Sequence, residues 1–348
     1  MGLDKRWIIA ASPLLIALLP LNPAASGRQK SQSEGQTIRL TVEMVSLPVV
    51  VTDRAGVRIL DLQKDDFQIT EDGVAQEIAG FALTDEPVSI ALAIDTSGSV
   101  EGQLARMQNE AIHFVNLLHP DDSVAILSFA EDVRLLEDWS IDRRRNARGI
   151  KESRHGTCTK VYEAVWLALE EVLKPVQERK ALVLFTDGED TASQKASQKE
   201  TLELAKETRA AIYSVYFQPD SRSLIGINAG GNPYPRRIPT TPPIIPPSGG
   251  GGCGGFGMPS GGHSYLEDLA EYTGGRVFDA HKLEDLGPAF DEVAKELASQ
   301  YSIGYYSTNN KRDGKFRRVQ VKVKRQDLSV RTKKGYYAPK DKASKSGG

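Results

Sequence analysis

The sequence is short of the residues from which many metal and catalytic centres are built. Its 348 residues include only two cysteines, Cys158 and Cys253, and five scattered histidines. Two cysteines cannot form a thiolate metal cage, and neither belongs to a Cys-x-x-Cys pair. The chain has no His-Glu-x-x-His motif and no Gly-x-x-x-x-Gly-Lys-Ser/Thr phosphate loop. Zinc proteolysis and nucleotide hydrolysis are therefore unsupported, whereas an oxidising compartment would permit a disulfide between the two cysteines.

An excess of charge of one sign is also lacking, because the net charge is −2. This balance implies no general attraction to nucleic acid. Residues 311–348 nevertheless hold 14 Lys or Arg and 3 Asp, so this end carries +11 and the rest carries −13. A patch for polyanions or membrane surfaces is one explanation. The alternation of Val319 and Val321 with Gln320 and Lys322 favours the other, the solvent face of a half-buried strand.

Long apolar runs are missing after the first few dozen residues. Lys5 and Arg6 precede an apolar run at residues 7–21, and small residues follow at 24–26. This order is typical of a secretory signal peptide, for which we expect residues 1–26. The run is short and broken by prolines, so an uncleaved membrane anchor is the less favoured alternative. We expect a secreted, periplasmic or cell-envelope protein with no stable membrane span after cleavage.

The rest of the chain divides by its pattern of apolar residues. Alternation of period two predicts strands, whereas buried apolar runs that alternate with amphipathic stretches predict a mostly parallel sheet with helices on both faces. The N- and C-terminal strands should pair in one small β-sandwich-like module, because neither set is stable alone. The expected segments are a flexible leader at 27–36, an N-terminal β module at 37–86, a doubly wound α/β domain at 87–300, C-terminal strands at 301–338 and a disordered tail at 339–348. Residues 218–262 are too rich in proline and glycine for a core and predict an inserted loop.

Oxygen-bearing side chains follow the buried strand at residues 88–94. Asp95, Ser97 and Ser99 alternate in the stretch Asp-Thr-Ser-Gly-Ser, so their oxygens can point into one space. Carboxylate and hydroxyl oxygens suit Mg²⁺, Mn²⁺ or Ca²⁺ better than zinc. The alternative is a helix N-cap, in which such side chains bond only to free backbone amides.

Two later loops could complete a metal shell. Asp187 follows a second buried strand, and both Thr157 and Thr159 come just before a predicted helix. Loops after parallel strands gather at the carboxyl edge of a doubly wound sheet, so these residues should lie together. Glu189 and Asp190 add charge there, either as solvated acids or as a second, weak cation site.

These motifs resemble the metal-ion-dependent adhesion site of von Willebrand factor type A (VWA) domains, over about residues 87–299. The flanking sequences look like those of secreted bacterial VWA-related proteins first noted in acidobacteria. The resemblance implies direct metal contact by Ser97, Ser99 and Thr159. It implies contact largely through water for Asp95 and Asp187, with Asp187 able to move into direct contact.

The resemblance also implies a function without catalysis. An acidic group of a protein partner would occupy the open metal position, which makes adhesion or other protein–protein interaction metal-dependent. The alternatives are a structural or assembly protein of the envelope with a fixed partner and, less favoured, a metal-dependent enzyme. A serine hydrolase is unsupported because Asp95 stands where a Gly-x-Ser-x-Gly elbow needs glycine. The sequence does not name the partner or the oligomeric state. The inserted loop leaves from the same predicted edge and could cover the site.

Overall fold

The structure is a computed structural model that describes residues 44–97, 103–218 and 261–340. Several predicted features lie outside these residues and stay predictions: the signal peptide, the leader, most of the inserted loop, Ser99, Cys253, and most of the tail. Within the described residues, Cys158 is 5% exposed, and the disulfide that the sequence permits with Cys253 is not tested by them.

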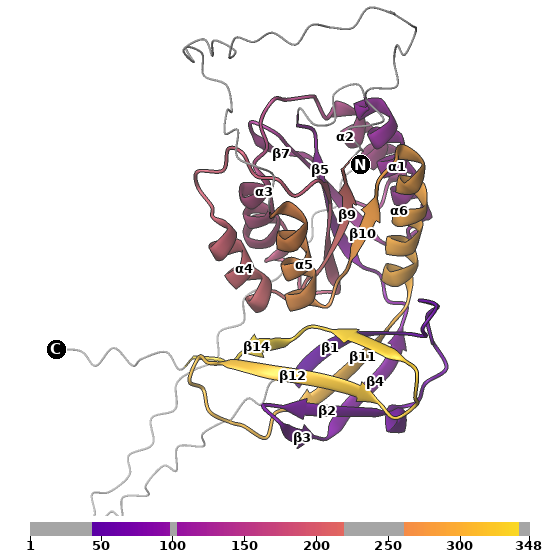
Figure 1. Cartoon of the computed structure of the whole chain (residues 1–348), viewed down its shortest axis with the longest axis vertical. Helices are drawn as coiled ribbons and strands as arrows, with labels where there is room; N and C mark the ends of the chain where they lie inside the picture. The colour runs from indigo at the N-terminus through magenta and orange to yellow at the C-terminus, as the bar shows by residue number, and fades with distance from the viewer. Residues whose placement is uncertain (1–43, 98–102, 219–260, 341–348) are drawn as a thin grey trace, which may run out of the picture. The chain divides into compact units, whose positions relative to one another are not determined.

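A six-stranded sheet with the order β10-β9-β8-β5-β6-β7 forms the centre of the α/β domain (Figure 1). Strand β7 pairs antiparallel with β6, whereas the other neighbouring strands are parallel. In chain order the strands are β5 (Ser89–Asp95), β6 (Ser123–Phe129), β7 (Val133–Ser140), β8 (Lys180–Thr186), β9 (Ala211–Phe217) and β10 (Val277–Ala280).

The central strands are apolar along their length because helices cover both of their faces. On β5, Ile90, Leu92 and Ile94 belong to one core cluster, whereas Ala91 and Ala93 belong to the other. All five side chains have no exposed surface. A strand that is buried on both faces shows the continuous apolar run seen in the sequence, and it brings its polar end to the edge of the sheet.

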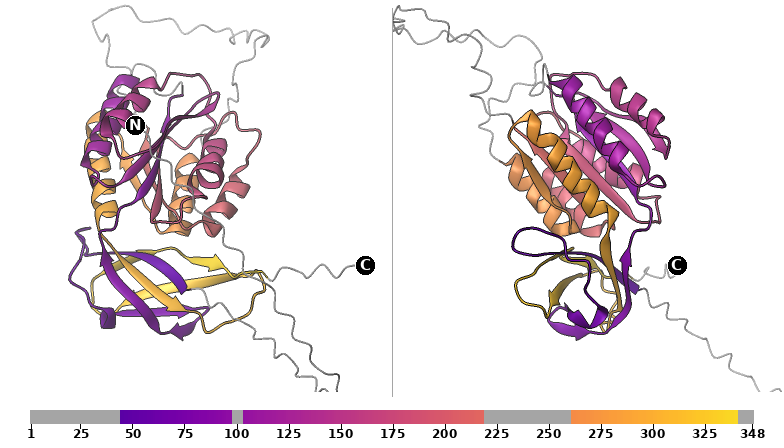
Figure 2. Two further views of the ribbon diagram at one scale, coloured as in Figure 1. Left: turned by 180° about the vertical axis from the view of Figure 1, so that it is seen from behind. Right: turned by 90° about the vertical axis from the view of Figure 1, so that its right-hand side faces the viewer.

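The helices lie in two layers on opposite faces of the sheet (Figure 2). The first layer contains α1 (Leu104–Leu117), α2 (Arg143–Glu152) and α6 (Leu283–Ala298). The second contains α3 (Val161–Leu167), which continues as a π-helical segment η3 (Ala168–Leu173), together with α4 (Gln198–Glu207) and α5 (Gly262–Thr273). The predicted doubly wound, mostly parallel α/β fold is confirmed.

A β module is built from strands at both ends of the described chain. Its two four-stranded sheets have the orders β13-β1-β11-β4 and β14-β12-β2-β3. The early strand β1 pairs with the late strands β11 and β13, and β2 pairs with β12. The bounds are β1 (Met44–Thr52), β2 (Phe67–Glu71), β3 (Val74–Gln76), β4 (Ile78–Thr84), β11 (Gln300–Tyr306), β12 (Phe316–Val323), β13 (Ser329–Thr332) and β14 (Gly335–Tyr337), with a short 3-10 helix η1 (Lys64–Asp66). The predicted sandwich-like module is confirmed, whereas the domain limits given as residue numbers stay predictions.

The hairpin of β2 and β3 turns at Asp72 and Gly73. Both residues have positive φ, 48° and 84°. This is the backbone of the two-residue turns that match strand twist, and aspartate followed by glycine adopts it with little strain. The Asp72 carboxylate also accepts a hydrogen bond of 2.9 Å from the backbone amide of Arg318 on β12, so the turn is fixed to the neighbouring strand.

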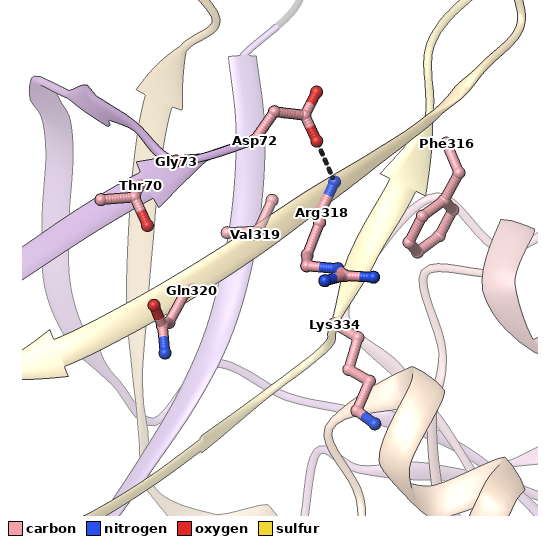
Figure 3. Close-up of a pocket in the computed structure, with 8 residues that line it drawn as sticks. All are labelled: Thr70, Asp72, Gly73, Phe316, Arg318, Val319, Gln320 and Lys334. Carbon is pink, nitrogen blue, oxygen red and sulfur yellow. Dashed lines mark hydrogen bonds between the residues drawn. The ribbon is translucent and has the colours of Figure 1, made fainter.

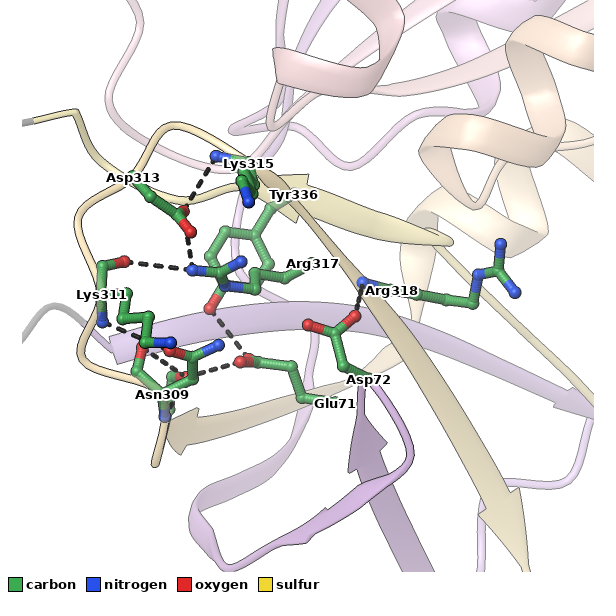
Figure 4. Close-up of polar contacts among 10 residues, drawn as sticks. Glu71, Asp72, Asn309, Lys311, Asp313, Lys315, Arg317, Arg318 and Tyr336 are labelled. Atoms are coloured by element: carbon green, nitrogen blue, oxygen red, sulfur yellow. Dashed lines mark hydrogen bonds and ion pairs between the residues drawn. The ribbon is translucent and has the colours of Figure 1, made fainter.

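A carboxylate is buried in the β module beside this turn (Figure 4). Glu71 is 2% exposed and accepts hydrogen bonds from the hydroxyls of Tyr305, Ser307 and Tyr336, at 2.8, 2.6 and 2.9 Å. The three donors offset the loss of water around the carboxylate. Burial and the neighbouring carboxylate raise the pKa of Tyr336 to about 12, which keeps its hydroxyl protonated as a donor.

Candidate metal centre

Asp95, the last residue of β5, is the buried acid of the predicted site. Its side chain is 1% exposed. One carboxylate oxygen, Oδ1, accepts a 3.0 Å hydrogen bond from the amide of Ser97, and the other, Oδ2, accepts one of 2.6 Å from the hydroxyl of Thr186. The hydroxyl of Ser97 bonds to the same carboxylate. Among the described residues no lysine or arginine pairs with Asp95, so its charge has no basic neighbour.

Strand register explains why Thr186 meets Asp95. Strands β5 and β8 are parallel neighbours, and Ile94 lies beside Phe185. The next residue is Asp95 on β5 and Thr186 on β8, so both lie at the carboxyl edge of the sheet. Thr186 is 2% exposed, and its oxygen also accepts a hydrogen bond of 2.9 Å from the amide of Gly188. Sequence reasoning missed Thr186, although its place directly before Asp187 at the end of a buried strand was a usable signal.

The electrostatics of this edge are unfavourable to two bare carboxylates. Burial, and then the charge of Asp187, raise the pKa of Asp95 to about 7, although bonds from Ser97 and Thr186 act in the opposite direction. Oδ1 of Asp187 accepts a hydrogen bond of 3.1 Å from the amide of Glu189. The structure thus brings the first and last acids of the predicted motif into electrostatic contact.

Thr159 is linked to both acidic loops through the backbone. Its carbonyl accepts hydrogen bonds from the amides of Thr191 and Ala192, which follow Asp187 in the same loop, at 2.9 and 3.0 Å. Three residues earlier, the amide of Gly156 donates to the carbonyl of Thr96 at 2.8 Å. Thr159 is 6% exposed, and its hydroxyl has no hydrogen-bond partner in the described part of the chain.

Two glycines allow the start of α5 to approach the Asp187 loop. Gly188 has a positive φ of 73°, and a Cβ atom added there would lie 2.6 Å from the carbonyl oxygen of Gly262. A Cβ atom at Gly262 would lie 2.6 Å from the carbonyl oxygen of Asp187. The amide of Gly262 also donates to Glu189 Oε1 at 3.3 Å. A side chain at either glycine would displace the loop that carries Asp187.

The alternatives raised for these loops can now be compared with the contacts. The N-cap of α1 is Gln103, so Ser97 does not cap that helix. The hydroxyl of Thr157 donates to Glu131 at 2.6 Å, and this bond lowers the pKa of Glu131 to about 2. Asp190 accepts bonds from the amide of Tyr162 and the hydroxyl of Ser193, so it holds the start of α3.

The donor set fits a hard divalent cation. Carboxylate and hydroxyl oxygens are the ligands preferred by Mg²⁺ and Ca²⁺. The described residues hold no group of three or more His, Cys, Asp or Glu side chains placed to bind a metal ion. The candidate centre differs from such groups because three of its five predicted ligands are hydroxyls. One of these, Ser99, lies outside the described part of the chain.

A separate hollow of about 1000 Å³ lies on the β module (Figure 3). It is lined by Thr70, Asp72, Gly73, Phe316, Arg318, Val319, Gln320 and Lys334. None of these residues belongs to the loops that follow β5 and β8. The hollow is therefore not part of the candidate metal centre.

Part of the chain matches a known domain family. Residues 90–189 match the family model described as the von Willebrand factor type A domain. No curated protein matches the chain.

Several solved structures are similar to parts of the chain, at low identity. A VWA protein from Catenulispora acidiphila has 13% identity and a TM-score of 0.45, over 80% of this chain and 76% of that one. Proximal thread matrix protein 1 from the mussel byssus has 15% identity and a TM-score of 0.44, over 66% and 51%. The vWF domain of the pili tip protein Mfa5 from Porphyromonas gingivalis has 20% identity and a TM-score of 0.29, over 31% and 40%. The match thus spans less than two thirds of the mussel and pilus structures.

The family match runs from β5 through Glu189. It therefore includes the loops of Asp95, Thr159 and Asp187 in their order along the chain. The sheet described above has the mixed α/β architecture of that family. The chain contains a von Willebrand factor type A domain, matched over residues 90–189.

Proposed function

We propose that the chain is a non-enzymatic VWA module that binds Mg²⁺, or Mn²⁺ or Ca²⁺, and uses it to dock an acidic group of a protein partner. The ligands would be Asp95, Ser97, Ser99, Thr159 and Asp187. The observation that carries the proposal is the buried carboxylate of Asp95, which has hydroxyl and amide partners but no basic one among the described residues. A buried charge without a counter-charge is costly, and a bound cation would remove that cost.

The residues of this chain would leave the cation able to accept a further ligand. Serine and threonine hydroxyls are neutral, so a shell rich in them balances little of the ionic charge. A divalent cation bound there would offer an open position to a carboxylate oxygen of a partner. Asp95 would orient Ser97 through the two bonds it accepts from that residue, and Thr186 would hold Asp95 in place.

We place this activity outside the cytoplasm on the evidence of the N-terminal sequence. Residues 1–26 have the order of charges, apolar residues and small residues of a signal peptide. None of the described helices is both long and apolar enough to cross a membrane. An assembly role with a fixed partner is the second candidate, and it differs from the first in the lifetime of the complex.

Calorimetric titration tests the metal site directly. Mg²⁺, Mn²⁺ and Ca²⁺ are added to the wild type, to Asp95→Ala and to Asp85→Ala, an exposed acid away from the centre. We expect binding to the wild type and to Asp85→Ala, and none to Asp95→Ala with its circular dichroism unchanged. The proposal fails if the wild type binds no divalent cation, or if Asp95→Ala binds as tightly as the wild type. A pull-down from envelope extract with and without chelator then separates a transient partner from a fixed one.

A further inference from the structure

Helix α2 carries an unusual concentration of positive charge. Residues 143–154 hold six basic residues and one acid, Glu152, in a chain whose net charge is −2. Arg143 and Arg145 have local partners, because Arg143 donates to the carbonyls of His119 and Asp122, and Arg145 pairs with Glu137. The four others, Arg144, Arg148, Lys151 and Arg154, are exposed, and their charged groups have no partner in the described part of the chain.

Three of these residues form a line along the outer side of α2. The buried side of the helix consists of Asn146, Gly149 and Ile150, of which Asn146 donates to the carbonyl of Val124. At 3.6 residues per turn, Arg144, Arg148 and Lys151 lie on the opposite side. We name these three residues the α2 basic stripe.

The stripe does not help the helix to form. Arg144 and Arg148 are four positions apart, and Arg148 and Lys151 are three apart, so like charges are neighbours and repel. The first turn holds three arginines and no acid, although the dipole of a helix favours acids there. The cap from Asp142 to the amide of Arg144 and the close packing of Gly149 on Glu137 hold the helix instead.

The carboxyl end of α2 is fixed beside the candidate metal centre. Ser153, which ends the helix, accepts two hydrogen bonds from Gln108 on α1, at 3.2 and 3.0 Å. Three residues later, Gly156 donates to the carbonyl of Thr96, the residue after Asp95. An extended chain spans at most about 3.6 Å per residue, so the Cα atom of Lys151 lies within about 18 Å of that of Gly156.

The opposite charge surrounds the centre itself. Asp95 ends β5, Asp187 follows the neighbouring strand β8, and Glu131 accepts a 2.6 Å hydrogen bond from the hydroxyl of Thr157. Once one carboxylate of a partner has bound the cation, its further acidic groups would be repelled by Glu131 and attracted along α2.

We propose that the α2 basic stripe binds further acidic side chains of the same partner segment whose carboxylate docks at the metal centre. The ligand is then an acidic protein segment that extends from the centre along α2 towards its amino end. This inference rests on the proposed function, because the metal centre supplies the first point of attachment. The stripe would set the direction of the segment and speed its association.

Two peptides separate the contributions of the stripe and the metal. Fluorescein-labelled polyglutamate of about 20 residues offers carboxylates and net charge, whereas an alternating Glu-Lys peptide of equal length offers carboxylates without net charge. Fluorescence anisotropy gives the Kd of each for the full chain, in Mg²⁺ and in chelator. The stripe variant changes Arg144, Arg148 and Lys151 to Gln. The matched control changes Arg318, Lys322 and Lys324 to Gln, three exposed residues of the β module and the turn after it whose charged groups have no partner in the described chain.

We expect the stripe variant to weaken polyglutamate binding about tenfold, as the product of three exposed ion pairs worth about twofold each. Binding of the Glu-Lys peptide and binding by the control variant should stay within about twofold of the wild type. High salt should remove most of the difference between wild type and stripe variant.

The outcomes distinguish the two proposals. Equal weakening in the stripe and control variants, or no binding of polyglutamate to the wild type, overturns the stripe. Weakening confined to the stripe variant, with no effect of chelator or of Asp95→Ala, overturns the proposed function and keeps the stripe. If heparin binds the stripe more tightly than polyglutamate does, whether or not Mg²⁺ is present, the assignment to an acidic protein segment is wrong.

Discussion

Replacing Asp95 by asparagine should make the metal-free protein more stable and remove its response to divalent cations. Burial and the charge of Asp187 raise the pKa of Asp95 from 3.8 to about 7. A carboxyl with a raised pKa contributes stability that is fully present below 3.8 and is lost as the pH rises through 7. At about pH 8 the ionised group therefore costs about 4 kcal/mol, from about three pKa steps of about 1.36 kcal/mol each.

Asparagine avoids this cost because it is neutral, but it loses one accepting oxygen. Asp95 accepts from the Ser97 amide on one oxygen and from the Thr186 hydroxyl on the other. The NH₂ group that replaces one oxygen would face the Ser97 amide or the Thr186 hydroxyl, and the lost hydrogen bond lowers the free energy of unfolding by about 2 kcal/mol. The net expectation is that Asp95→Asn is more stable than the wild type by about 2 kcal/mol at about pH 8 without metal. The advantage should disappear near pH 5, where folded Asp95 is mostly protonated.

Guanidinium unfolding followed by circular dichroism measures these differences. The wild type, Asp95→Asn and the exposed control Asp85→Asn are compared in chelator and in Mg²⁺, at about pH 8 and pH 5. Mg²⁺ at about a hundredfold excess over its Kd should stabilise the wild type and the control by about 2.7 kcal/mol and leave Asp95→Asn unchanged. The reasoning is refuted if Asp95→Asn is the less stable protein in chelator at pH 8, or if Mg²⁺ stabilises it as much as the wild type.

Three further changes test other parts of the structure. Gly262→Ala should weaken Mg²⁺ binding at least tenfold in calorimetry, because its Cβ atom would press on the carbonyl of Asp187. The control Gly287→Ala should leave Mg²⁺ binding unchanged, because its Cβ atom would meet only the flexible carboxylate of Glu110. Glu71→Leu should lower the free energy of unfolding in urea by about 3 kcal/mol, because three hydroxyls lose their acceptor; a loss below about 1 kcal/mol would contradict this. Burial, and then the charge of a nearby arginine, lower the pKa of Lys333 from 10.5 to about 8. The free energy of unfolding should therefore rise between about pH 8 and 10.5, because the folded protein loses that proton before the unfolded chain does. Lys333→Met should be more stable than the wild type at about pH 7 and should not show this rise.

The strands were predictable because their physics is local and continuous. An apolar run such as that of β5 needs cover on both faces, and repeated strand and helix patterns then imply a doubly wound sheet. The position of Asp95 at its polar end follows from the same pattern. The sequence placed Thr186 at the same edge, but not its bond to Asp95, because that bond depends on the register of β5 against β8, which no local pattern specifies.

Helix α2 was missed for a different reason. Helices are recognised by an apolar stripe, and the side that α2 buries consists of an amide, a glycine and one isoleucine, Ile150. Its packing depends on a close approach of Gly149 to Glu137 on β7 and on a bond from Asn146 to the backbone of β6. Such contacts exist only after the sheet has formed, so the sequence of α2 shows its charge more clearly than its structure.

Two departures from the rules of local stability occur at the same edge of the sheet. Asp95 is a buried acid beside another acid, and α2 lines up like charges on a helix whose first turn would favour acids. Each alone has an ordinary explanation, as a satisfied buried polar group or as a solvated helix side. The bond from Gly156 to Thr96 places them in adjoining segments of the chain, so both costs would be relieved by one binding event, a cation at Asp95 and an acidic segment along α2. A fold selected for stability alone would have removed both, Asp95 by one substitution and the like charges of α2 by a few, and the pairing of the two favours retention for binding.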